Sequence, residues 1–204
     1  MPIRSDDEAI GMGGTIAKFV KQGKKVIKVV FSHGEKSIPL HQERFVKRER
    51  KKETRDASEF IGIKETIYLG LADTKVKKEV KGPKMDKKVY EIIKKYKPEK
   101  IFLPSALDIH PDHQGVHNKV LEVLDQRIIY YPVYAYEVWN IMKEDYPMVY
   151  EDISEFMKKK MDYIKRFKSQ WMYMFTLYLP AYFRAKSYGN KIKTKFAERF
   201  YRIR

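Results

Sequence analysis

Short runs rich in β-branched residues alternate along this chain with longer charged stretches of helical periodicity. Residues 25–32, 65–71, 100–103 and 128–139 read as strands, and residues 7–22, 39–60, 85–96, 111–124 and 154–170 read as helices. Strands that alternate with helices form a mostly parallel sheet between helical layers, because each connection crosses one face of the sheet. The sequence therefore predicts a three-layer, Rossmann-like α/β fold.

This alternation starts on a helix. Only residues 1–5 stand before the helical pattern of residues 7–22, whereas an α/β unit normally begins with a strand. We therefore expect the first strand to be missing. The length of 204 residues predicts a single domain over 1–204, with residues from about 140 to 204 as a C-terminal extension packed on it.

The absence of cysteine excludes disulfides and thiolate metal sites, so a metal would need His, Asp and Glu ligands. The formal net charge of +16 is compatible with an anionic partner, but the lysines are spread along the whole chain, as on a solvated surface. No apolar leader is visible, and the apolar run 171–183 is too short to span a bilayer. We expect a cytoplasmic protein without a transmembrane segment.

Two carboxylates, Asp6 and Asp7, stand at the start of the first predicted helix. Taken alone, they are typical of helix capping, because negative charge at a helix start is stabilised by the helix dipole. The glycines at 11, 13 and 14 do not form a dinucleotide fingerprint, since Ile16 stands where its third glycine belongs and no strand precedes them. Small residues here more simply indicate close packing of this helix.

A second polar segment, Asp108-Ile-His-Pro-Asp-His113, follows the strand predicted at 100–103. Two histidines three residues apart, with a carboxylate between them, suit one metal ligand and one imidazole that handles a proton. The structural alternative is two loop histidines and a capping aspartate. His33 follows a strand and is a further candidate for the same site, whereas His117 is more typical of a surface histidine than of a ligand.

Together these motifs resemble the PIG-L/LmbE-type family of zinc-dependent N-acetylglucosaminide de-N-acetylases. That family carries His-Pro-Asp-Asp-Glu before a Gly-rich helix, and later Asp-x-His-Pro-Asp-His. Residues 6–14 are similar to the first motif from its third position onward, and residues 108–113 are similar to the second throughout. Weaker similarities follow in order along the chain: Arg50 with Glu53, residues 69–73, residues 168–170 and residues 197–200.

The resemblance implies a zinc-dependent hydrolase that removes the acetyl group from an N-acetylated amino sugar or its conjugate. It implies that Asp7 and His113 are zinc ligands. It also implies that Asp6 is the general base for the attacking water and that His110 stabilises the oxyanion. Such chemistry is coherent, because zinc activates water near neutral pH while a carboxylate and an oxyanion donor assist the attack.

Other positions receive supporting roles from the same resemblance. Asp112 would orient a histidine from beyond the metal ligands. Arg50 and Asp73 would contact sugar hydroxyls or an anionic aglycone. The implied partner is a small amino-sugar molecule and not a specific nucleic acid, and a homo-oligomer is compatible with the sequence.

The chain departs from the family pattern at its first motif. Arg4 and Ser5 stand where the family has His and Pro. Arginine stays protonated and has no acceptor atom, so it cannot ligate zinc. Catalytic zinc normally takes three protein ligands, and only two are identified here. We therefore expect strongly reduced zinc affinity and activity.

Three explanations of Arg4 are open. The chain is a pseudoenzyme that keeps the fold, or it recruits His33 or His117 as a ligand, or its start is misassigned. The joint absence of strand and histidine favours the third. The alternative function is a non-catalytic protein that binds sugars or anionic surfaces. Its support is the charge and the aromatic and basic residues of 163–204, although a core-packing helix with a basic outer face explains that stretch more simply.

Overall fold

The computed structural model describes residues 6–34, 43–139 and 145–204. Its helices are α1 (Asp7–Lys21), α2 (Glu43–Ile61), α3 (Val76–Glu79), α4 (Pro83–Tyr96), α5 (Pro111–Gln126), α6 (Met157–Ile164) and α7 (Trp171–Lys191), with the 3-10 turns η1 (Ser154–Phe156) and η2 (Lys168–Gln170). Its strands are β1 (Ile27–Ser32), β2 (Glu65–Leu71), β3 (Ile101–Pro104), β4 (Val133–Tyr136), β5 (Met148–Asp152) and β6 (Ala197–Arg202).

The predicted α/β fold is confirmed. The N-terminal elements lie close to their predicted positions, and β2 coincides with the prediction, while residues 39–42 of the second predicted helix lie outside the described residues. The short helix α3 was not predicted, and the other differences are C-terminal. The run 128–139 contains only the short β4, the helix predicted over 154–170 is split into η1, α6 and η2, and the sequence did not predict β5 or β6.

Two sheets form within the described part of the chain. One pairs β1 with β2 in parallel, and the other has the order β3-β4-β6-β5. In the second sheet β3 and β4 are parallel, whereas β6 runs antiparallel to both β4 and β5. No strand joins β1 to β3 among residues 6–34, 43–139 and 145–204.

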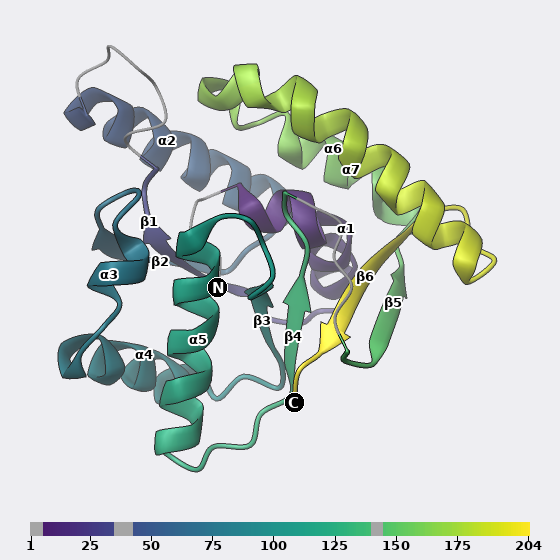
Figure 1. The fold of residues 1–204 in the computed structure, drawn as a ribbon. Helices are drawn as coiled ribbons and strands as arrows, with labels where there is room; N and C mark the ends of the chain where they lie inside the picture. Colours follow the sequence, from purple (N-terminus) through teal and green to yellow (C-terminus); the bar gives the residue numbers. More distant parts are fainter. Residues whose placement is uncertain (1–5, 35–42, 140–144) are drawn as a thin grey trace.

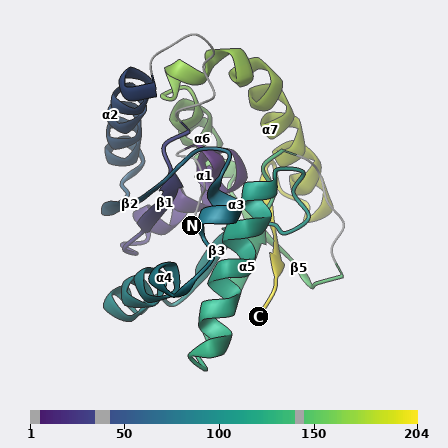
Figure 2. The same cartoon turned by 60° about the vertical axis from the view of Figure 1, so that its left-hand side comes forward.

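Helices cover both faces of the strands. α1, α2, α6 and α7 lie on one face, and α3, α4 and α5 lie on the other (Figures 1 and 2). Each face has its own apolar core: Ala9, Ile16 and Phe167 belong to the first, and Val29 and Val120 to the second. Burial of apolar surface on both faces is the main force that holds such layers together.

The long helix α7 packs into the first core, as its simpler interpretation predicted. Leu177, Ala181 and Ala185 recur at helical spacing and are buried, whereas Leu179 and Phe183 on the outer side are exposed. The outer face is therefore partly apolar and not purely basic. Over the described residues, helices with the length and apolarity required to cross a bilayer are not found.

Helix α1 contains a kink that the C-terminal part of the chain stabilises. Met12 has a non-helical backbone (φ −148°, ψ 20°). Just beyond it, the amides of Gly14 and Thr15 donate to the carboxylate of Glu198 in β6, over 3.0 and 2.7 Å. Lys160 Nζ of α6 lies 2.6 Å from the same buried carboxylate. Amides that follow a kink need acceptors, as those of a helix start do, and Glu198 supplies them.

Replacing Glu198 with alanine is expected to lower the free energy of unfolding by about 3–5 kcal/mol, because Lys160 would stay buried without its carboxylate. As a control, Glu155→Ala removes an exposed carboxylate 3.3 Å from Lys21 Nζ. It is expected to change the free energy of unfolding by less than about 0.5 kcal/mol. Urea unfolding measures both. Equal losses would contradict a special role for Glu198.

Candidate active site

The predicted site residues gather where the parallel strands end. Asp7 begins α1, Asp108 follows β3 and His113 lies in the first turn of α5. The backbone amide of Lys77, in α3 beyond β2, donates to the Asp112 carboxylate over 2.9 Å. The segment after β2 thus meets the start of α5, so both sheets present their carboxyl ends at one edge. Ligands of α/β sheets bind at this edge.

The centre of the site is a buried line of three side chains. His113 Nε2 lies 3.3 Å from Asp7 Oδ2, and His113 Nδ1 lies 3.0 Å from Asp108 Oδ1. All three side chains are at most 3% exposed. The imidazole is thus held between two carboxylates. Asp7 belongs to the first motif and Asp108 to the second, about a hundred residues apart in the chain.

Asp108 also accepts hydrogen bonds from two backbone amides. Its Oδ1 also accepts from the His110 amide over 2.9 Å, and its Oδ2 accepts from the Trp139 amide over 3.2 Å. Hydrogen bonds from several donors are what a fully buried carboxylate requires. Asp108 therefore fixes the ring of His113, the start of α5 and the chain beyond β4 relative to one another.

His110 is the N-cap residue of α5 and lies beside His113, with ring centroids 5.1 Å apart. Its Nδ1 accepts from the Asp112 amide over 3.3 Å. A neutral imidazole whose Nδ1 accepts carries its proton on Nε2. His110 is therefore built to donate a hydrogen bond from Nε2 while its other nitrogen is used by the helix.

The charge state of His113 follows from its neighbours. Burial lowers its pKa, but the negative charges of Asp7 and Asp108 and their hydrogen bonds outweigh that effect and raise the pKa to about 9. With Nδ1 directed at Asp108, Nε2 is the nitrogen that faces Asp7. In the neutral ring, Nε2 would be free to act as a ligand.

The pair formed by Asp7 and His113 fits two corners of a zinc site. Two atoms that each lie about 2.0–2.1 Å from a tetrahedral ion are about 3.3 Å apart, and Asp7 Oδ2 and His113 Nε2 are 3.3 Å apart. Across the described residues, however, no three His, Cys, Asp or Glu side chains are grouped closely enough to hold a metal. Arg4, at the position of the third family ligand, lies outside the described residues.

The supporting residues predicted from the family lie deeper than a substrate contact requires. Arg50 and Asp73 are buried, at 1% and 0% exposure. Asp112 accepts from Lys77, whereas the carboxylate that contacts the ring of His113 is Asp108. Both aspartates belong to one motif, so spacing alone did not reveal which of them faces the ring.

The two alternative ligands lie in other surroundings. The ring of His33 stacks on Tyr68, with centroids 4.8 Å apart. His117 is buried at 4% exposure and its Nδ1 lies 2.9 Å from the Pro104 carbonyl, so its interpretation as a surface histidine was wrong. An apolar helix face could have signalled this, because neighbouring positions 116 and 120 carry valine.

Sequence reasoning also missed a buried charge network behind Asp7. Glu8 pairs with Lys28 of β1 and accepts from the Tyr163 hydroxyl over 2.5 Å. Burial raises the pKa of Glu8, while Lys28 and Tyr163 act in the opposite direction. A lysine inside the apolar run 25–32 was the available signal, because a lysine in a buried strand requires a carboxylate partner.

Comparison with known proteins supports the same assignment. The family model of PIG-L, described as GlcNAc-PI de-N-acetylase, matches residues 5–124. Two similar proteins are both named probable N-acetyl-alpha-D-glucosaminyl L-malate deacetylase 2. The one from Bacillus cereus is 33% identical over 128 residues, which cover 59% of this chain and 57% of that protein. The one from Bacillus anthracis is 25% identical over 178 residues, which cover 81% and 77%.

Solved structures share the fold. N,N'-diacetylchitobiose deacetylase from Pyrococcus horikoshii has a TM-score of 0.82 at 24% identity, covering 98% of this chain and 80% of that one. The conserved protein TT1542 from Thermus thermophilus has a TM-score of 0.84 at 20% identity, covering 100% and 92%. GalB, a 4-carboxy-2-hydroxymuconate hydratase from Pseudomonas putida, has a TM-score of 0.81 at 20% identity, covering 100% of this chain and 96% of that one. A hydratase among them shows that the fold alone does not fix the reaction.

The first Bacillus relative extends well beyond the match, since the chain covers only 57% of its length. The family model, in contrast, spans most of the chain up to the end of α5 and includes Asp6, Asp7, Asp108 and His113. The resemblance seen in the motifs is thereby confirmed, and the chain belongs to the PIG-L family of GlcNAc-PI de-N-acetylases.

Proposed function

We propose that this chain hydrolyses the acetamide of an N-acetylated amino sugar or its conjugate, with zinc held by Asp7 and His113. The carrying observation is the 3.3 Å approach of Asp7 Oδ2 to His113 Nε2, with Asp108 fixing the ring from its other side. Family membership and the names of the Bacillus relatives support deacetylation as the reaction. A bound zinc ion would supply activation of water and polarisation of the carbonyl.

The protein groups then have distinct roles in the proposed reaction. Asp6, next to Asp7 at the start of α1, takes a proton from the attacking water. His110 donates from Nε2 to the oxygen that gains charge as the carbonyl carbon becomes tetrahedral. When the tetrahedral carbon collapses, the C–N bond breaks and the nitrogen takes the proton that Asp6 received from the water, so the products are acetate and the free amine. Asp108 keeps His113 in one orientation throughout.

Contacts to the sugar are assigned to Arg50 and Asp73, which the family pattern places in that role. Because both are buried in this structure, their contact with a substrate would need the segments around them to open. Asp112 supports the site by anchoring α3 to the first turn of α5 through the Lys77 amide.

Position 4 limits the proposed zinc site. Arg4 brings a cation and no donor lone pair to the place of the third family ligand. Two ligands hold zinc much more weakly than three. We therefore assign this chain a reduced zinc affinity and a reduced rate of hydrolysis.

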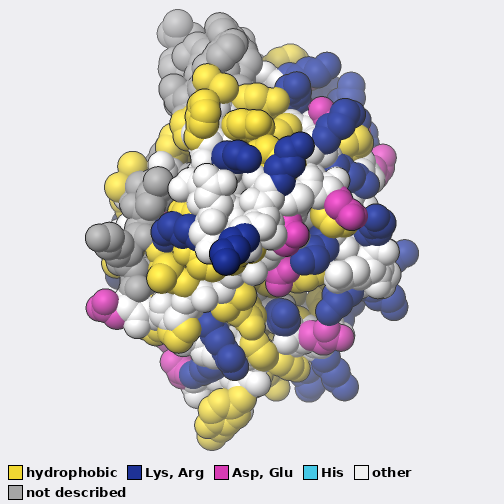
Figure 3. All heavy atoms as spheres, turned by 90° about the vertical axis from the view of Figure 1, so that its right-hand side faces the viewer, with side chains coloured by type: hydrophobic (Ala, Val, Ile, Leu, Met, Phe, Trp, Pro, Cys, Tyr) yellow, Lys and Arg dark blue, Asp and Glu magenta, His cyan; other side chains and the backbone are white. Residues whose placement is uncertain are grey.

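The second candidate is a non-catalytic protein of the same family. It is favoured by Arg4 and by the lack of a third ligand within the described ranges. Its proposed binding to anionic surfaces has weaker support. On the face in Figure 3, Lys and Arg side chains are scattered among carboxylates and apolar groups, and a scattered charge gives weak and salt-sensitive binding.

Restoring a histidine at position 4 tests whether Arg4 reduces the zinc affinity and the rate of hydrolysis. The Arg4→His variant is expected to bind zinc at least about tenfold more tightly than the unchanged chain, because a neutral imidazole replaces a cation. Isothermal titration measures the affinity, and acetate release from N,N'-diacetylchitobiose measures the reaction. Arg4→Ala is the control for removal of the charge alone. Tight one-to-one zinc binding by the unchanged chain would overturn the impairment.

The general base is tested in the Arg4→His background. Asp6→Asn is expected to slow acetate release by roughly 10²–10⁴-fold, because the amide cannot take a proton. Zinc affinity should stay the same. Asp56→Asn makes the same chemical change on the exposed side of α2, with a side chain 47% exposed, and should leave the rate unchanged. A rate unaffected by Asp6→Asn would remove Asp6 from the mechanism.

Asp108→Asn tests the orientation of His113. The neutral amide removes the negative charge that faces His113 Nδ1 and keeps one acceptor oxygen for the two backbone amides, so the ring is held less firmly. Zinc affinity of the Arg4→His protein should fall by about 10–100-fold. The control Asp125→Asn alters a carboxylate that is 59% exposed and paired with Arg204, and should not change affinity. Unchanged zinc affinity in Asp108→Asn would contradict the positioning role.

A further inference from the structure

Residues 137–139 connect the candidate site to the C-terminal part of the chain. They follow β4 directly, at the carboxyl end of that strand. The amide of Trp139 donates to Asp108 Oδ2 over 3.2 Å, and Asp108 Oδ1 lies 3.0 Å from His113 Nδ1. The position of this segment therefore affects the carboxylate that orients the ring of His113.

Arg184 of α7 holds this segment through two backbone oxygens. Its Nη1 and Nη2 donate to the carbonyls of Val138 and Glu137 over 3.2 and 3.3 Å. Both of these residues are 2% exposed, and carbonyl groups buried in this way need donors from the protein. A guanidinium carries its donors in a rigid planar fork, which suits two successive carbonyls. Arg184 thus fixes the backbone immediately before Trp139.

Other parts of the chain fix the first residue of this segment, Glu137. Arg199 of β6 pairs with its carboxylate, and the Tyr188 hydroxyl of α7 donates to that carboxylate over 2.5 Å. α1 packs against its carbonyl, because a Cβ atom at Gly11 would lie 2.9 Å from that oxygen. These contacts anchor the start of the segment, whereas Arg184 reaches one residue closer to the site.

A single peptide group links Arg184 to Asp108. The oxygen of the peptide group between Val138 and Trp139 accepts from Arg184, and the N–H of the same group donates to Asp108. Because a peptide group is planar, a donor that fixes its oxygen also fixes the direction of its N–H. A charged donor on the oxygen also polarises the group and strengthens the hydrogen bond on the other side.

We propose that Arg184 is a positioning residue for the zinc ligand His113 and acts through this peptide group and Asp108. This role rests on the proposed function, because it assigns Arg184 to the same site. α7 lies on the opposite face of the strands from α5, which carries His113 (Figures 1 and 2). The site therefore depends on a residue beyond 5–124, the part of the chain that the family model matches.

Arg184→Met removes both donors and keeps a long side chain. In the Arg4→His protein it is expected to lower zinc affinity about tenfold, as loss of a residue that supports a metal ligand does. Arg204→Met is the matched control, because Arg204 Nη1 donates over 3.2 Å to the carbonyl of Ile129, ahead of β4 and away from the site. It should leave the affinity unchanged. Equal zinc affinities of the two variants would overturn the positioning role.

A double-mutant cycle shows whether Arg184 acts through Asp108. Once Asp108→Asn is present, adding Arg184→Met should weaken zinc binding by less than about twofold, because the two residues belong to one path. A purely structural role predicts independent effects. A second full loss of about tenfold in the double variant would therefore contradict the path through Asp108.

Amide hydrogen exchange tests the same path without zinc. Arg184→Met should speed exchange of the Trp139 amide by about tenfold or more relative to the other buried amides of the protein. If the Arg4→His protein binds no zinc, the proposed function fails, and the exchange rate of Trp139 still decides whether Arg184 holds the peptide group. An unchanged rate at Trp139 would overturn the proposal.

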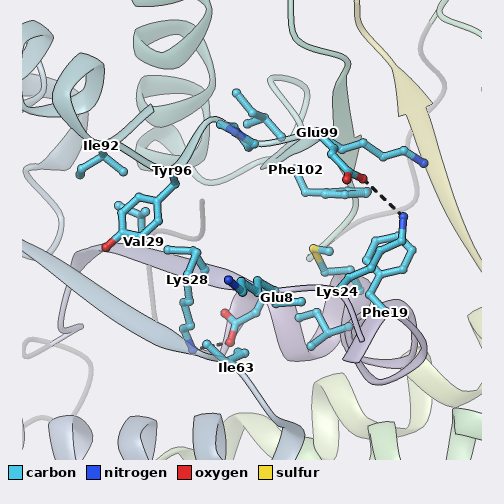
Figure 4. Close-up of a pocket in the computed structure, with 18 of the residues that line it drawn as sticks. Glu8, Phe19, Lys24, Lys28, Val29, Ile63, Ile92, Tyr96, Glu99 and Phe102 are labelled. Atoms are coloured by element: carbon cyan, nitrogen blue, oxygen red, sulfur yellow. Dashed lines mark hydrogen bonds and ion pairs between the residues drawn. The ribbon is translucent and has the colours of Figure 1, made fainter. Parts of the chain in front are cut away.

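A destabilised variant away from the site separates positioning from stability. Ile92 of α4 lines a cavity of about 490 Å³ at the amino ends of β1 and β3 (Figure 4). Ile92→Ala should lower the urea midpoint but leave zinc affinity and the relative exchange of Trp139 unchanged. If it changes both as Arg184→Met does, lost stability explains the effects and the proposal fails. Arg184→Gln keeps a polar side chain in this half-buried position and carries the same tests if the Met variant does not fold.

Discussion

The carboxyl edge of the strands depends on the buried carboxylate of Asp108. It lies 3.0 Å from His113 Nδ1 and accepts from the amides of His110 and Trp139, which belong to separate segments of the chain. A buried charge is stable only when all its donors are in place. The packing of these segments therefore also orients the ring, and Asp7 lies 3.3 Å from its other nitrogen.

The same principle recurs further from this edge. Glu198 with Lys160, Glu8 with Lys28, and Glu137 with Arg199 are buried pairs that join segments distant in the sequence. Each pair costs desolvation, so it adds little net stability, but breaking it leaves a buried charge without its partner. The chain has a net charge of +16, and these three carboxylates each pair with a buried cation that joins two distant segments. The kinked α1 is held in this way from both α6 and β6.

The sequence predicted what depends on local periodicity and on motifs. β2 was placed correctly, and the motifs that contain Asp7 and His113 meet in space. It did not predict β6, because the charges of Glu198 and Arg199 disguise a buried strand and their partners lie far away in the chain. The sequence also assigned the orienting role to Asp112, whereas Asp108 is the carboxylate beside the ring of His113. Sequence spacing does not show which carboxylate faces the ring, because that depends on how the first turn of α5 is rotated.

The division of the strands into two sheets has a consequence for self-association. Two sheets have twice as many edges as one, and exposed edges are where chains pair with one another and aggregate. Here β2 and β5 form the outer edges, while β1 and β3 face each other under α1 and α4. The covering helices keep the inner edges from pairing with the edge of another sheet.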